Sequence, residues 1–256
     1  MKKIIIANWK MNPQTARQAL QLADEVRRGA KSLKNVEAVL APPFLYIPII
    51  SKILSGKSNL RLAAQDIFWE KGGAYTGEIS ADQLKASGVK LVIVGHSERR
   101  ALGETNEIVN KKLKAVLGAS MRAVLCVGEA ERQKEVAFPK IIRDELHEGL
   151  TRIKKSLFRN LVVAYEPIWA ISTAGRGRAD NPQNIYEITT IIRRELYRMV
   201  GKRTASKISV LYGGSVDDKN ARAFVKDGAV DGLLVGGASL DAKKFIGLLK
   251  EVEKIQ

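Results

Sequence analysis

Cysteine and histidine are scarce in this 256-residue chain. Cys126 is the only cysteine, which excludes an internal disulfide framework and fits a reducing cytoplasm, where we expect the protein to work. The two histidines, His96 and His147, lie far apart in the sequence. Two distant histidines and one cysteine do not have the spacing of a zinc site, so we expect no metal centre.

Long apolar runs are also missing. No stretch is long enough to span a bilayer. After the basic start, only residues 4–7 are apolar before Asn8, too few for the hydrophobic region of a signal peptide. We therefore expect neither a membrane segment nor a secretion signal.

Acidic residues are fewer than basic ones. The chain has 43 Lys and Arg against 27 Asp and Glu, a formal charge of +16. Such a balance fits a nucleic-acid partner, an anionic substrate or simply a basic surface. The positive residues are dispersed along segments such as 152–159 and 193–203, without interleaved aromatics or a nucleic-acid motif. We favour a solvated basic surface, with steering of an anionic substrate as the alternative, and expect no nucleic-acid partner.

Short β-branched runs alternate with segments that have helical spacing. The runs are near-continuously apolar, as in strands buried on both faces of a parallel sheet. They occupy residues 3–8, 36–41, 60–65, 91–95, 123–127, 161–166, 208–212 and 232–235. We expect Asp217 and Asp241 to begin the last two of the intervening helices.

Eight strand–helix units without a linker or a compositional break predict one closed (β/α)8 barrel, a TIM barrel, over residues 1–256. The alternative is a doubly wound open sheet. No Gly-x-Gly-x-x-Gly follows the first strand, so we favour the barrel.

In such a barrel, the residues at the carboxyl ends of the strands form the active site. The first strand ends at Asn8 and is followed by Lys10, which is placed to hold an anion but is also compatible with an ordinary surface lysine. The fourth is followed by His96 at the start of a helix. A helix N-terminus favours the neutral imidazole, which can donate to an oxygen, although a purely structural histidine fits equally.

The sixth strand ends at Glu166, where partial desolvation makes a carboxylate a better general base. A structural ion pair is the alternative.

Glycine pairs follow strands seven and eight, in YGGS at 212–215 and GGAS at 236–239. The loops after these strands are the usual phosphate site of the fold, and paired glycines let backbone N–H groups approach an anion.

The chain resembles the triosephosphate isomerase family over its whole length. The resemblance rests on NWKMN at 8–12, GHSERR at 95–100, AYEPIWA at 164–170, YGGS at 212–215 and LVGGASL at 234–240. It implies an isomerase of glycolysis and gluconeogenesis that interconverts dihydroxyacetone phosphate and D-glyceraldehyde 3-phosphate without a cofactor.

The resemblance also implies roles. Glu166 matches the catalytic base, His96 the neutral electrophile and Lys10 the cation that binds substrate, with Asn8 beside it. The phosphate-gripping positions match Ser172, Ser215, Gly236 and Gly237. Residues 65–78 resemble the family's interdigitating loop, in which Thr76 reaches the active site of a partner, so a homodimer is implied.

The lid is where the chain departs from the family. Members typically have AIGTGK, whereas this chain has AISTAGRGRADNP at 170–182, about three residues longer. Ser172 and Ala174 replace lid glycines, and either Arg176 or Arg178 takes the place of the lysine or is merely solvated. We expect a lid that still closes but is more mobile without substrate.

The alternatives to an isomerase are another phosphosugar-binding barrel and a non-catalytic basic binding protein.

Overall fold

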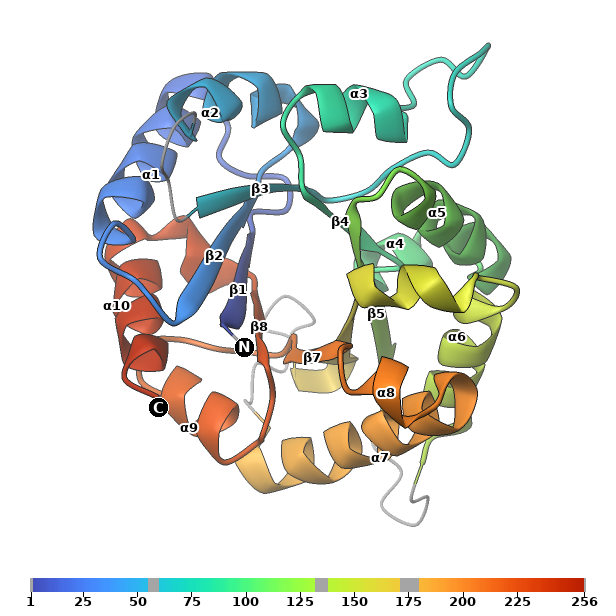
Figure 1. Ribbon diagram of the computed structural model, residues 1–256. Helices are drawn as coiled ribbons and strands as arrows, with labels where there is room; N and C mark the ends of the chain where they lie inside the picture. Colours follow the sequence, from blue (N-terminus) through green and yellow to red (C-terminus); the bar gives the residue numbers. More distant parts are fainter. Residues whose placement is uncertain (1, 55–59, 132–137, 171–179, 256) are drawn as a thin grey trace.

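The computed structural model describes residues 2–54, 60–131, 138–170 and 180–255. Parallel strands close into a barrel in chain order, and β1 pairs with both β2 and β8 (Figure 1). The strands are β1 (Lys3–Asn8), β2 (Val36–Ala41), β3 (Leu60–Ala64), β4 (Leu91–Val94), β5 (Arg122–Glu129), β6 (Leu161–Pro167), β7 (Ser209–Tyr212) and β8 (Gly232–Val235). The predicted (β/α)8 barrel is confirmed.

Helices form a ring outside the strands (Figure 1). The α-helices are α1 (Ala16–Gly29), α2 (Ile47–Leu54), α3 (Ala81–Ala86), α4 (Ser97–Ala101), α5 (Asn106–Gly118), α6 (Lys140–Leu150), α7 (Pro182–Val200), α8 (Lys202–Ala205), α9 (Ala221–Lys226) and α10 (Ala242–Glu253). The 3-10 helices are η1 (Phe44–Tyr46), η2 (Lys155–Asn160), η3 (Ile168–Ala170) and η5 (Gly237–Leu240).

Of the two residues predicted to begin helices, Asp241 does so and Asp217 does not. Asp241 caps α10, because its Oδ1 accepts two backbone N–H groups of the first turn, at 2.9 and 3.1 Å. The prediction for Asp217 is wrong, since α9 begins only at Ala221. Asp217 Oδ1 instead accepts backbone N–H groups two and three residues ahead, which closes a local turn before the helix.

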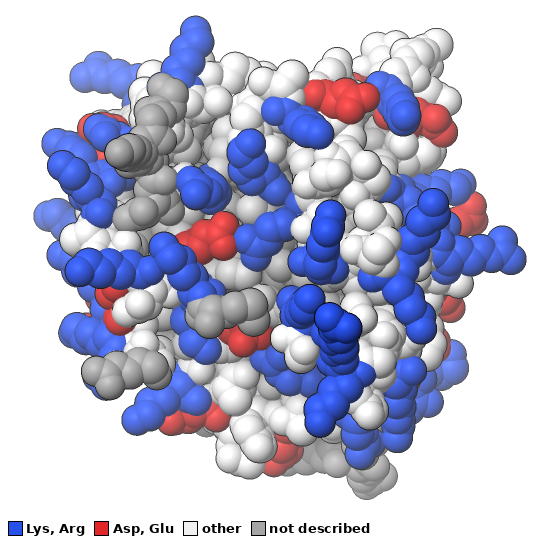
Figure 2. Space-filling model, in the orientation of Figure 1, with Lys and Arg blue, Asp and Glu red and all other residues white. Residues whose placement is uncertain are grey.

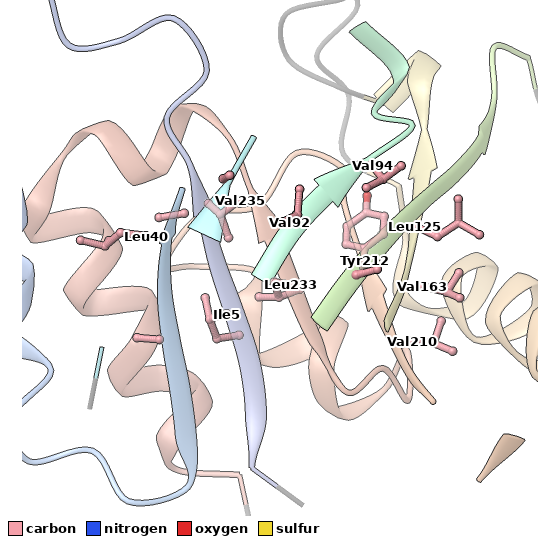
Figure 3. Packing of buried hydrophobic residues seen from close by; sticks show 14 of the residues in the cluster. Ile5, Leu40, Val92, Val94, Leu125, Val163, Val210, Tyr212, Leu233 and Val235 are labelled. Atoms are coloured by element: carbon pink, nitrogen blue, oxygen red, sulfur yellow. The ribbon is translucent and has the colours of Figure 1, made fainter. Parts of the chain in front are cut away.

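The barrel has an inner and an outer apolar layer. The outer layer packs the strands against the helices and includes Ile5 and Val163, whose side chains are among those shown in Figure 3. The inner layer fills the barrel and includes Ile4, Ile6 and Val162. Adjacent strand residues therefore serve opposite layers, which explains why the strands are apolar almost throughout.

The same alternation aims two polar side chains into the mouth of the barrel. Asn8 follows Ile4 and Ile6 on the inner face of β1, and Glu166 follows Val162 and Ala164 on that of β6. Both positions lie at the carboxyl ends of their strands. The fold thus brings a carboxamide and a carboxylate to the end where barrel enzymes bind their substrates.

No helix within the described ranges combines the length and the hydrophobicity that a membrane crossing requires. Lys and Arg side chains are spread over the face of the molecule shown in Figure 2, with acidic side chains between them. Helix α4 is faint in Figure 1 and so lies on the far side. The cations of the visible face therefore cover the end of the barrel opposite the carboxyl ends of the strands.

Candidate active site

A pocket opens at the carboxyl ends of the strands. Its lining includes every predicted site residue that falls within the described ranges, namely Asn8, Lys10, His96, Glu166, Ser215, Gly236 and Gly237. Ser172, the remaining predicted site residue, lies outside the described residues, as do Arg176 and Arg178. The structure therefore collects residues from five different strand ends in one place.

Lys10 is held in an unusual backbone conformation. Its φ is +53°, in the left-handed region that non-glycine residues rarely adopt. The backbone N–H of Lys10 donates to Asn8 Oδ1 at 3.1 Å, and Gln65 Nε2 donates to the Lys10 carbonyl at 2.9 Å. Nζ lies 2.7 Å from Glu98 Oε1. Asn8 and Gln65 thus hold a strained turn that brings the ammonium into the pocket; the sequence did not reveal this role of Gln65.

The tautomer of the neutral His96 ring follows from its neighbours. The buried imidazole caps α4, and its Nδ1 accepts the backbone N–H of Glu98 at 3.2 Å. A ring nitrogen that accepts a hydrogen bond carries no proton, so the proton of the neutral ring lies on Nε2. This Nε2 lies 3.1 Å from Glu166 Oε1. His96 therefore presents a hydrogen-bond donor to the pocket.

The carboxylate of Glu166 is 2% exposed and is held from two sides. Its Oε2 accepts the backbone N–H of Ser97 at 2.9 Å, at the N-terminus of α4, where a negative charge is stabilised. Opposite, a Cβ on Gly213 would lie 3.1 Å from Glu166 Cγ. The glycine after β7 therefore leaves the room that the glutamate side chain occupies.

The glycines after β8 adjoin Lys10. Gly236 and Gly237 form the N-terminal end of η5, and a Cβ on Gly236 would lie 3.5 Å from Lys10 Cε. Backbone N–H groups at the start of a short extra helix after strand eight form the phosphate site of many barrels of this type. An anion bound there lies within reach of the lysine ammonium.

Cys126 lies beneath the pocket and is chemically inert. Burial raises the pKa of its thiol well above the usual value, and the nearby Glu166 carboxylate raises it further. The thiol therefore stays protonated at neutral pH and does not act as a nucleophile. Within the ranges that the structure describes, no three His, Cys, Asp or Glu side chains are grouped as metal ligands.

Comparison with known proteins finds the same family throughout. The family model described as "Triosephosphate isomerase" matches residues 3–252. A protein of that name from Thermoanaerobacter sp. (strain X514) is 41% identical over 246 residues, covering 95% of this chain and 97% of the relative.

Two further relatives carry the same name. The one from Citrifermentans bemidjiense is 39% identical over 98% of this chain and 99% of its own length. The one from Dictyoglomus thermophilum is 38% identical over 97% and 99%, respectively. The similarity extends over essentially the whole length of each relative, so it includes every strand end that lines the pocket.

Proposed function

Because the chain belongs to the triosephosphate isomerase family, we propose that Glu166, His96 and Lys10 carry out its reaction. That reaction interconverts dihydroxyacetone phosphate and D-glyceraldehyde 3-phosphate, a step of glycolysis and gluconeogenesis. The observation that carries the assignment is the contact of 3.1 Å between His96 Nε2 and Glu166 Oε1 in a pocket that also contains Lys10.

The chemistry follows from these positions. Glu166 takes a proton from the carbon next to the carbonyl and returns it to the neighbouring carbon. The Nε2–H of His96 donates to the carbonyl oxygen and moves a proton between the two substrate oxygens, and the Lys10 ammonium stabilises the enediolate. A glutamate base paired with a neutral imidazole at a helix N-terminus is the established arrangement of this family.

The substrate phosphate is assigned to Ser215, Gly236 and Gly237, with Ser172 of the lid as a fourth contact. Gly236 adjoins the Lys10 side chain, which supports a position of the substrate phosphate near the ammonium. Glu98 now holds that ammonium at 2.7 Å, and the backbone N–H of Ser97 holds Glu166. Both groups change partners when substrate binds.

A coupled assay with D-glyceraldehyde 3-phosphate tests the proposal, with 2-phosphoglycolate as an inhibitor that mimics the enediolate. Turnover that 2-phosphoglycolate inhibits competitively is the expected result. A second candidate, another phosphosugar-binding barrel, shares the phosphate loops but does not require the contact between His96 and Glu166. Binding of 2-phosphoglycolate without turnover would favour that candidate.

We also propose a homodimer. Residues 70–78 are exposed along their whole length, and the segment projects beyond the ring of helices (Figure 1). Large apolar side chains are exposed in three other segments that follow the carboxyl ends of strands: Met11 is 85%, Leu45 82% and Leu102 79% exposed. Exposed apolar groups gathered at one end of a barrel are typical of a protein interface. A partner's Thr76 would reach this end, near Asn8, Lys10 and His96.

A cytoplasmic location is proposed on two grounds. The reaction belongs to central carbon metabolism, and Cys126 is a free, buried thiol of the kind that reducing compartments preserve. Many of the cations lie at the opposite end of the barrel from the pocket (Figure 2). The acidic side chains between the cations of this face support a solvated basic surface as a cause of the +16 charge.

A further inference from the structure

A largely buried ion pair lies outside the lining of the catalytic pocket. Arg100 follows His96 by four residues in α4, and Glu145 lies in α6; their side chains are 17% and 6% exposed. Arg100 Nε lies 3.3 Å from Glu145 Oε1. Burying two charges is costly unless their remaining polar atoms are also satisfied. Their other contacts therefore show what the pair does.

Glu145 is hydrogen-bonded to β5, the strand that pairs with the strand of Glu166. Its Oε2 accepts the backbone N–H of Gly128 at 2.8 Å. Gly128 is the register partner of Glu166 in the ladder between β5 and β6, and a Cβ on Gly128 would lie 1.9 Å from the Glu166 carbonyl oxygen. The two backbones are therefore in direct contact, and fixing Gly128 fixes the backbone from which the base projects.

Arg100 is hydrogen-bonded to Gly95, the residue before His96. Its Nε donates to the Gly95 carbonyl at 2.8 Å, and its Nη2 donates to the Cys126 carbonyl at 3.4 Å. Gly95 has a φ of +72°, and a Cβ there would lie 3.0 Å from Arg100 Nη2. A side chain at position 95 would thus be both strained and crowded. The guanidinium fixes the turn that leads into His96.

We infer that Glu145 and Arg100 are positioning residues that set the separation of His96 and Glu166. The two catalytic groups follow or end β4 and β6, the two strands that flank β5 in the barrel. The ion pair adds a second connection between the end of β4 and β5, from Gly95 through Arg100 and Glu145 to Gly128, the register partner of Glu166. Neither Arg100 nor Glu145 is among the residues that line the pocket.

The inference predicts a selective effect on the chemical step. A misplacement of about 1 Å between reacting groups costs on the order of 10²-fold in rate. The phosphate loops follow β7 and β8 on the other side of the pocket, so loss of the ion pair should leave them in place. Substrate affinity should then change far less than turnover.

The test uses Glu145→Ala and Glu145→Gln, with Asp144→Asn as the control. Asp144 is the neighbouring acid of α6, is partly exposed and pairs with Lys140 at the helix surface. In the Ala variant, we expect kcat to fall about 10- to 100-fold with KM within about twofold. Gln keeps an acceptor for the Gly128 N–H, so it should restore part of the turnover. The control should keep the wild-type kcat.

Two ligands separate positioning from general damage. 2-Phosphoglycolate, which contacts the catalytic groups, should bind Glu145→Ala more weakly by about the factor lost in kcat, while inorganic phosphate should bind as it does to the wild type. A folded Ala variant with unchanged kcat would overturn the inference. Equal losses for both ligands would also overturn it, because they would indicate disorder of the whole pocket.

Folding is checked by circular dichroism. If Glu145→Ala does not fold, Glu145→Gln decides, and an unchanged kcat in that variant counts against the inference. The inference rests on the proposed roles of His96 and Glu166, which Glu166→Gln tests separately. If Glu166→Gln loses activity but the Glu145 variants do not, only the inference is contradicted. If Glu166→Gln remains active, the proposed mechanism itself is contradicted.

Discussion

The imidazole Nε2 of His96 and the carboxylate Oε1 of Glu166 lie 3.1 Å apart, so the proposed electrophile and base are in contact before a substrate binds. Nδ1 already accepts a backbone N–H, so the single proton of the neutral ring lies on Nε2, the nitrogen nearer the carboxylate. A substrate carbonyl that enters between the two groups can accept that proton.

Glu166→Gln tests this arrangement directly. The amide is close to the carboxylate in shape and keeps an acceptor for the Ser97 N–H, so the fold should be preserved, but it does not take a proton from carbon. We expect kcat to fall by about 10²–10⁴-fold or more, with a smaller change in KM. The coupled assay measures both constants. Glu187→Gln, an exposed position on α7, is the control, and an unchanged kcat in the Glu166 variant contradicts the mechanism.

Much of the fold was predictable, because each barrel strand is buried on both faces and so has a strong, short apolar signature. The same regularity places Asn8 and Glu166, since each is the first polar residue in an inward-facing series. The roles of these residues came from the family resemblance, because spacing alone left an ion pair open for Glu166.

Contacts between distant residues were not predictable. Gln65 holds the Lys10 turn across 55 residues of sequence, and Glu145 holds Gly128 from a helix that the motifs do not include. No local pattern distinguishes these polar side chains from exposed ones. The prediction for Asp217 failed for the opposite reason. Its carboxylate accepts hydrogen bonds from nearby backbone N–H groups, which forms a turn before the helix begins.

Gly128→Ala tests the contact between β5 and the catalytic strand. The added methyl would lie 1.9 Å from a backbone oxygen that cannot rotate away, so the strands must separate. We expect a loss of about 1–3 kcal/mol in the free energy of unfolding and a drop in kcat of tenfold or so. Urea unfolding and the coupled assay measure these.

The matched control is Gly118→Ala at the end of α5, where a Cβ meets no atom within 4 Å. That change should alter stability by no more than about 1 kcal/mol. Equal behaviour of the two alanine variants would show that the close approach at Gly128 does not constrain the active-site strand.

The pH dependence of stability reports on Glu145. Burial raises the pKa of its carboxyl to about 7, outweighing the guanidinium of Arg100 and the Gly128 N–H, and the Glu166 charge adds to the rise. The folded state therefore binds a proton that the unfolded state has already released between the unfolded pKa of 4.5 and pH 7. This group's contribution to stability is present below pH 4.5 and is lost as the pH rises toward 7.

Glu145→Gln does not titrate and so isolates that contribution. Relative to the variant, the wild type should lose on the order of 3 kcal/mol in the free energy of unfolding between pH 4.5 and 7, and nothing further above pH 8. Urea unfolding at pH 5, 6, 7 and 8 measures the difference. A constant difference across this range would show that Arg100 keeps the carboxylate ionised throughout.

The proposed dimer is tested at Thr76. Sedimentation should give the wild type a mass of about twice the 28.2 kDa of the chain. In Thr76→Arg, a bulky charge enters the interface, so we expect monomers and a reduced kcat, because Asn8 and Lys10 lose the loop proposed to order them. Thr151→Arg, an exposed site at the opposite end of the barrel, should remain dimeric and active. A monomeric Thr76→Arg with full activity would mean that one chain already holds a complete site, with Asn8 and Gln65 sufficient to maintain the strained Lys10 turn.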